Sequence, residues 1–235
     1  MTITNAGDQK NESSQPRYFD EQPITLAGSV LGQKRHICGL FRNSEEEYEA
    51  LLPFIKEGFE RGENAFHVVN PVLKESHAAR LASAGIDVSE AEKNGQYQLC
   101  DWDEVYCPAG RFDQDNMLNM WKNLLDGTSS KDSPRTRLVA HMEWALEDRD
   151  GVSDLIEYEA RFNNVHHGCN DPVICAYDLT KFPADIIMDV LRTHPMVIVG
   201  GALQENPLYT PPEEFLREFL WRRSKDRKSA RPSDS

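Results

Sequence analysis

The sequence predicts an α/β fold, a three-layer sandwich with a mainly parallel central sheet. Six short apolar runs alternate with longer segments of helical periodicity along the 235 residues. Several runs are almost continuously apolar, among them V-I-C-A-Y and M-V-I-V, as expected for strands covered on both faces. Strands that alternate with helices are typical of βα units, in which helices cover both faces of a parallel sheet.

The apolar runs and the periodic segments between them predict individual elements. We expect strands at 36–41, 65–69, 97–101, 137–142, 173–177 and 196–199. We expect helices at 44–61, 71–84, 114–125, 153–165 and 183–192, and a last helix after residue 211. The first helix is predicted to open with a capping box, Ser44 with Glu47 three residues later, and to stop at Gly62.

The chain ends differ from the rest in composition. Residues 1–30 are polar and irregular, which predicts a flexible N-terminal arm. Residues 31–223 are long enough to form one domain that includes the last helix, and residues 224–235 are expected to be a disordered tail.

Charge and composition exclude several classes of protein. Asp and Glu number 39 against 26 Lys and Arg, a formal net charge of −13, which argues against a surface for direct nucleic-acid binding. No apolar run approaches the roughly 20 residues of a membrane span, and no signal pattern is seen, so a cytoplasmic protein is expected. The five cysteines are irregularly spaced and form no C-x-x-C pair, which gives a disulfide framework or a structural zinc site little support.

Sequence motifs for catalysis are absent. The turn after the first strand, F-R-N-S-E-E-E, lacks both G-x-x-x-x-G-K-[ST] and G-x-G-x-x-G, and its glutamates would repel a phosphate. Neither a G-x-S-x-G elbow nor an H-E-x-x-H motif occurs. We therefore expect no enzyme, no catalytic residue and no cofactor.

His36 and Cys38 lie on one face of the first strand, because side chains alternate along a strand. They could form a functional pair on a pocket wall, or they could be a hydrogen-bonded core histidine and a small buried hydrophobe. Two ligands are too few for a metal, so a third and a fourth would have to come from elsewhere.

The segment R-L-V-A-H-M-E-W-A-L places His141 and Glu143 on one face near the end of a strand. In the helix that follows, Glu159 lies on the apolar side, where a carboxylate is costly unless it is paired or faces a polar cavity. His141 or Arg161 is the expected partner if the role is structural, with Arg161 otherwise paired to Glu157 on the surface.

Two further stretches contain histidine. V-H-H-G-C-N could supply metal ligands, but a helix C-terminus explains it more simply. T-H-P-M-V-I-V-G-G places His194 before a buried strand, and its two glycines permit a tight turn or the close approach of a ligand.

Several stretches together resemble one family: H-I-C-G-L-F, H-M-E-W-A-L, L-I-E-Y-E-A-R-F-N, I-C-A-Y-D and L-R-T-H-P-M-V-I-V-G-G-A-L-Q-E-N-P. They resemble the MEDS domain, the methanogen and methylotroph sensory domain, over roughly residues 34–219. The resemblance implies a fold similar to the RecA and KaiC ATPase cores without the phosphate loop. It also implies a sensor of simple hydrocarbon derivatives in prokaryotic signalling.

The family signature H-x-[C or A]-x-[L or F]-[F or Y] maps onto His36, Cys38, Leu40 and Phe41. A position that accepts alanine suits a pocket wall better than a nucleophile or a metal ligand. Relatives usually attach this domain to a histidine kinase, a phosphatase-type regulator or a DNA-binding region. No such region is recognised here, so we expect action through a partner protein.

The main hypothesis is a non-catalytic sensory domain that binds a small organic ligand, with no metal. The expected pocket is built from His36, Cys38, His141, Glu143, Glu159, Tyr177 and His194. The alternative is a degenerate RecA-like scaffold or regulator that oligomerises, or that binds a signalling protein or a nucleotide. A third possibility is a cryptic enzyme or metal protein using His36, Cys38 and His141.

Overall fold

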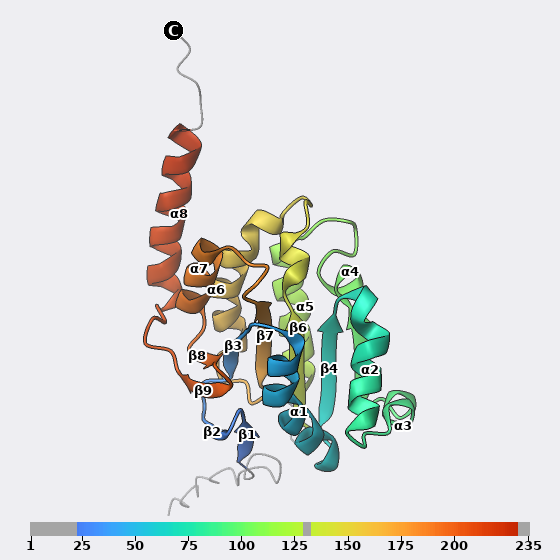
Figure 1. Cartoon of the computed structure of the whole chain (residues 1–235). Helices are drawn as coiled ribbons and strands as arrows, with labels where there is room; N and C mark the ends of the chain where they lie inside the picture. Colours follow the sequence, from blue (N-terminus) through green and yellow to red (C-terminus); the bar gives the residue numbers. More distant parts are fainter. Residues whose placement is uncertain (1–22, 129–132, 230–235) are drawn as a thin grey trace, which may run out of the picture.

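A computed structural model describes residues 23–128 and 133–229 (Figure 1). The centre is a seven-stranded sheet with the order β5-β4-β6-β7-β3-β8-β9. All its neighbouring strands are parallel except β8 and β9, so the predicted α/β class is confirmed. The strands are β3 His36–Phe41, β4 Asn64–Val69, β5 Tyr97–Asp101, β6 Thr136–His141, β7 Val173–Asp178, β8 Met196–Val199 and β9 Ala202–Glu205.

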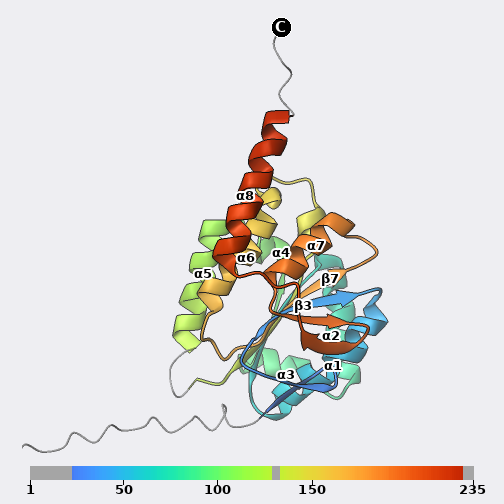
Figure 2. The ribbon, with the colours of Figure 1, turned by 90° about the vertical axis from the view of Figure 1, so that its left-hand side faces the viewer.

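The helices form a layer on each face of this sheet (Figure 2). One core packs β3, β4 and β7 against α1 Ser44–Glu60, α2 Lys74–Ser83 and α3 Val88–Lys93. The other core contains residues of α4 Trp102–Val105, α5 Gln114–Thr128, α6 Leu155–His166, α7 Ala184–Thr193 and α8 Pro212–Ser229. Short 3₁₀ helices lie at Pro71–Leu73, Glu143–Leu146 and Val152–Asp154.

The sequence-based boundaries need correction at both ends of the chain. Ile24–Leu26 and Ser29–Leu31 form an antiparallel hairpin, β1 and β2, whose Ile24 and Leu26 side chains are buried. The predicted flexible arm is therefore wrong for this hairpin, because its apolar side chains join the core beside α1. Helix α8 likewise continues past residue 223 to Ser229. Residues 1–22 and 230–235 of the expected arm and tail lie outside the described residues.

The start of α1 differs from the predicted capping box by one residue. Asn43, not Ser44, is the N-cap, and its side chain accepts a hydrogen bond from the backbone N–H of Glu46 at 3.0 Å. Glu46 in turn accepts one from the backbone N–H of Arg42 at 2.8 Å. The box thus uses Glu46, which leaves Glu47 free to reach across to the sheet.

The order of the strands creates a crevice between β3 and β7 at the carboxyl end of the sheet. Neighbouring strands β3 and β7 are followed by α1 and α7, and these helices lie in the two different cores. Ligands of open α/β sheets bind at such a point, where the connections leave toward opposite faces. No helix in the described part of the chain is both long and apolar enough to cross a membrane.

Candidate functional site

The seven predicted pocket residues divide between two places, which Tyr177 connects. His36, Cys38, Glu159, Tyr177 and His194 gather in the core under α6 and α7. The structure therefore does not build one pocket from all seven.

His141 and Glu143 are the two that lie apart. His141 pairs with Glu47 of α1, on the opposite face of the sheet. Glu143 follows β6 at the carboxyl edge, where it pairs with Lys181 at 3.4 Å.

Glu159 is the centre of the buried group. Its side chain is 0% exposed, and its Oε2 atom lies 3.3 Å from Nε2 of His36 and 3.4 Å from Nε2 of His194. The hydroxyl of Tyr177 donates to its Oε1 atom at 2.8 Å. Cys175, which the sequence analysis did not select, places its Sγ atom 3.9 Å from Oε2.

The predicted partners of Glu159 and Arg161 were therefore wrong. Arg161 donates to Gln114 and Asp115 of α5, and Glu157 instead contacts Arg223 of α8. The reason is packing. Helix α6 contacts α5 and α8, and its Arg161 and Glu157 side chains pair with polar groups on those helices rather than with each other.

Hydrogen bonds on the outer side of each imidazole determine its tautomer. The amide nitrogen of Asn163 donates to the backbone carbonyls of Thr193 and Glu159 at 2.7 and 3.1 Å, so its oxygen faces Nδ1 of His36 at 3.1 Å. Nδ1 of His194 faces the carbonyl oxygen of Val190 at 2.8 Å. An oxygen acceptor needs a proton on Nδ1, so the Nε2 atom of each ring carries a lone pair toward Glu159.

Burial favours the neutral forms of this group. Burial lowers the pKa of His36 and of His194 to about 3, and neighbouring histidines add to that effect. Burial raises the pKa of Glu159 against the opposing influence of His194 and Tyr177. Burial also raises the pKa of the Cys38 and Cys175 thiols, so neither is an activated nucleophile.

The opposite face carries an ion pair near the rim. Nε2 of His141 donates to Glu47 at 2.8 Å. Burial alone would lower the pKa of His141, but the Glu47 carboxylate raises it above the ordinary value. Burial alone would raise the pKa of Glu47, yet His141 lowers it, so each member favours the charged form of the other. A hydrogen-bonded chain of Tyr48, His77 and His67 packs beside this pair.

A small cavity lies at the crevice between β3 and β7. Its volume is about 60 Å³, and its walls include Phe41, Leu73 and Ala176 together with His141, Glu143 and Lys181. Tyr177 also lines it, and thus connects the cavity to the buried group around Glu159. The sequence analysis predicted His141, Glu143 and Tyr177 here but missed Lys181, whose spacing of three from Asp178 was the available signal.

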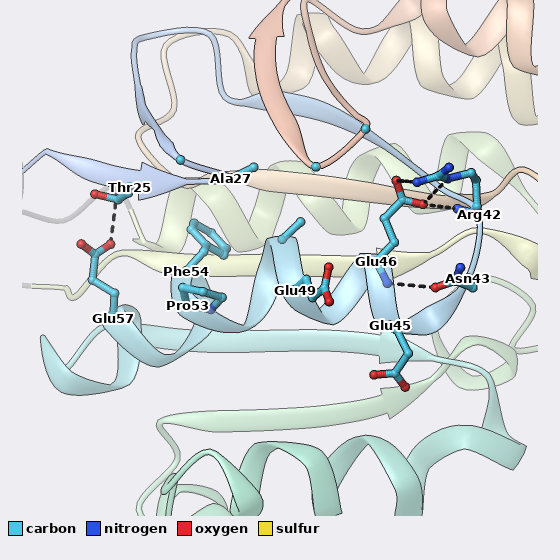
Figure 3. A pocket seen from close by; sticks show the side chains of 14 residues that line it. Thr25, Ala27, Arg42, Asn43, Glu45, Glu46, Glu49, Pro53, Phe54 and Glu57 are labelled. Atoms are coloured by element: carbon cyan, nitrogen blue, oxygen red, sulfur yellow. Dashed lines mark hydrogen bonds and ion pairs between the residues drawn. The ribbon is translucent and has the colours of Figure 1, made fainter.

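A larger hollow of about 710 Å³ lies between the β1–β2 hairpin and α1 (Figure 3). It is rich in glutamate, but most of these carboxylates have cationic partners within the protein. Arg42 binds Glu46 at 3.0 Å, Arg61 binds Glu57 at 2.6 Å, and Arg80 binds Glu45. These carboxylates therefore need no cationic ligand to balance their charge.

The glycine pair at residues 200 and 201 forms the tight turn between β8 and β9 and lines this larger hollow. Both residues have positive φ, 58° and 76°, as a two-residue hairpin turn requires. Of the two roles that the sequence left open for these glycines, the turn is the one observed.

The predicted family can now be compared with known proteins. The family model described as "MEthanogen/methylotroph, DcmR Sensory domain" matches residues 35–195. This chain belongs to the MEDS family. The transcriptional repressor DcmR of Methylorubrum extorquens is 27% identical over 171 residues, which cover 72% of this chain and 61% of the repressor. The chain thus spans less than two thirds of that repressor's length.

Two solved structures from Pyrococcus horikoshii are similar in fold. An uncharacterized protein in complex with an unknown peptide has a TM-score of 0.55 at 10% identity, over 75% of this chain and 83% of that one. A KaiC-like protein has a TM-score of 0.48 at 17% identity, over 70% of each chain. Membership of the MEDS family identifies the chain as a sensory domain.

Proposed function

We propose that this chain senses a small organic compound in the cavity between β3 and β7, and passes the signal to a partner protein in the cytoplasm. The observation that carries the proposal is the cavity itself, which lies at the switch point of the sheet where α/β proteins bind ligands. The MEDS family supports the sensory part.

The size of the cavity favours a compound of few heavy atoms. One water-sized occupant needs roughly 10–15 Å³ on this measure, so a volume of about 60 Å³ suits a molecule of only a few atoms. Apolar side chains such as Phe41 and Leu73 would contact a carbon skeleton. His141, Glu143 and Lys181 would orient one polar or halogenated group.

Binding to this cavity can be tested by thermal shift. The panel contains short alcohols, amines, carboxylates and halogenated methanes, with ATP and ADP as the competing class. A ligand at 100 times its Kd stabilises the native state by about 2.7 kcal/mol, which raises Tm measurably. The proposal fails if nucleotides raise Tm and no small organic compound does.

Matched variants locate the site. Glu143→Gln should remove the shift, because Glu143 lines the cavity, whereas Glu147→Gln, at the C-cap of the same 3₁₀ turn, should retain it. A hollow of about 300 Å³ lined by Tyr106, Met117 and Met120 is the competing location. If Met120→Ala removes the shift and Glu143→Gln does not, the ligand binds there instead.

A regulator that self-associates or binds a signalling protein is the second candidate. Helix α8 buries Phe215 and Phe219 but leaves Leu220 48% and Trp221 61% exposed. We expect a Leu220→Ser, Trp221→Ser double variant to abolish any concentration-dependent rise in sedimentation coefficient. A wild-type chain that stays monomeric at every concentration would contradict self-association.

A further inference from the structure

Four side chains of three chemical kinds converge in the core under α6 and α7. They are His36 from β3, Glu159 from α6, Cys175 from β7 and His194 at the end of α7. Each offers one donor atom, two imidazole nitrogens, one carboxylate oxygen and one sulfur, and these atoms all lie within 4.8 Å of one another. All four residues are buried. None of them belongs to the cavity assigned above to the organic ligand.

Four of the six separations between the donor atoms are close to the edges of a tetrahedron around a metal. Bonds of about 2.0–2.1 Å to N or O and about 2.3 Å to S place neighbouring ligands about 3.3 Å apart, or about 3.6 Å where sulfur is included. The observed separations from Glu159 are 3.3 Å to His36 and 3.4 Å to His194. The Cys175 sulfur lies 3.7 Å from His36 and 3.9 Å from Glu159.

Lone pairs of nitrogen, oxygen and sulfur converge at the centre of this group. Because both Nδ1 atoms donate outward, two Nε2 lone pairs point at a single carboxylate oxygen. The Cys175 thiol can donate to His36, but Nε2 of His194 has no hydrogen-bond partner within the described residues, although it is fully buried. A bound cation would satisfy all four donors together.

We infer that His36, Glu159, Cys175 and His194 bind one divalent transition-metal ion, and that Zn²⁺ is the ion they suit best. Two neutral imidazoles, one carboxylate and one thiolate balance the two positive charges, and binding releases the protons of Glu159 and Cys175 to solvent. No redox step is involved. Four protein ligands leave no open position, as in structural rather than catalytic zinc sites.

The surrounding groups support this assignment. Metal-bound histidines usually donate their other ring N–H to a carbonyl or carboxylate oxygen, as His36 does to Asn163 and His194 to Val190. Tyr177 donates to the remaining oxygen of Glu159. The ion would tie α6 and the end of α7 to the strands β3 and β7, and burial of the ligands implies that it enters before the core closes.

Cys38 supplies a matched control for Cys175. The two cysteines are paired in register across β3 and β7, and both are buried on the same face of the sheet. Only Cys175 belongs to the ligand set. Cys38→Ala therefore removes the same atoms from the same layer without removing a ligand.

The test measures metal content and coordination in the full chain purified without chelator. We expect about one zinc ion per chain in the wild type and in Cys38→Ala, and a large loss in Cys175→Ala and His194→Ala. After exchange with Co²⁺, sulfur-to-cobalt charge-transfer absorption should appear in the wild type and in Cys38→Ala, and should disappear in Cys175→Ala.

X-ray absorption of the wild type keeps the test valid if the ligand variants do not fold. It should show one sulfur at about 2.3 Å and three N or O atoms at about 2.0–2.1 Å. A folded wild-type chain that contains no transition metal and takes up no Co²⁺ would overturn the inference, and would identify the group as a network held by protons alone. Unchanged metal content in a folded Cys175→Ala would also overturn it. Neither result bears on the organic-ligand cavity.

Discussion

Both faces of the sheet bury a glutamate beside histidines, yet the two glutamates have opposite protonation preferences. Under α6, Glu159 is 0% exposed and burial raises its pKa. Under α1, the Glu47 side chain is 15% exposed, and His141 lowers its pKa in spite of burial. The residue types are the same, and the depth and the orientation of the imidazoles differ.

That difference explains why Glu47 and His141 form an ion pair whereas Glu159 and its two histidines form a cluster of possible metal ligands. His141 directs a protonated Nε2 at Glu47, which gives a stable charged pair near the rim. His36 and His194 direct lone pairs at Glu159, because their protons are held on Nδ1 by Asn163 and Val190. Under α6, the hydrogen bonds behind the two imidazoles decide which ring nitrogen faces the carboxylate.

The largest expected effect on stability comes from replacing each of these two glutamates in turn, which tests the comparison directly. Glu159→Ala should lower the free energy of unfolding by more than about 3 kcal/mol, since several buried polar groups lose their partner at about 1–3 kcal/mol each. Glu47→Ala should cost about 1.5–3 kcal/mol, because it removes one charged hydrogen bond and His141 can then lose its proton and stay buried in its neutral form. Urea unfolding at neutral pH measures both values. Equal losses would show that the two faces do not differ in the way proposed.

A smaller effect sharpens the comparison at the start of α1, which directs Glu47 toward His141. Asn43→Ala should cost about 1 kcal/mol, because it removes the side-chain cap of Glu46. Ser44→Ala, one residue later, should cost only a few tenths of a kcal/mol, since surface substitutions away from such features stay within about ±0.5 kcal/mol. A larger loss of stability for Ser44→Ala than for Asn43→Ala would contradict Asn43 as the N-cap and support Ser44, as the sequence predicts.

The smallest expected effect is a pH dependence of the rim pair, because burial offsets much of the influence of Glu47 on His141. The raised pKa of His141 means that its contribution is complete below its unfolded value of 6.5 and is lost as pH rises through the folded value. The lowered pKa of Glu47 means that its contribution is complete above 4.5 and is lost as pH falls through the folded value.

The stability difference between the wild type and His141→Gln should therefore be greatest between about pH 4.5 and 6.5. Glu143 and Lys181 also act on His141, with opposite signs, and His77 and Asp178 act on Glu47 in the same opposed way. Denaturant unfolding of both proteins across pH 5 to 8 measures the difference. A difference that grows toward pH 8 would contradict the charged pair.

The strands were the part of the fold most readily predicted. All six expected strands lie within one residue of the observed boundaries, because strands covered on both faces are continuous apolar runs. Three short strands were missed: β1 and β2 lie in a segment of polar composition, and β9 reads A-L-Q-E with little apolar signal. Their pairing depends on partners elsewhere in the chain.

The candidate site was predicted only in part. Alternation along β3 placed His36 and Cys38 together, and helical spacing placed Glu159 on the buried side of α6. The same reasoning could not exclude His141, because alternation says which residues of one strand share a face and not which face of the sheet that is. Cys175 appeared as an ordinary core residue of V-I-C-A-Y.

The sequence by itself determined the α/β class, the positions of the main strands and the MEDS family, since these depend on local apolar patterns and family motifs. Only the tertiary structure decided that Cys175, rather than Cys38 or His141, joins His36, Glu159 and His194. The physical reason is strand order. Residues 139 positions apart meet because β3 pairs with β7 and α6 covers that pair, and no local pattern encodes either contact.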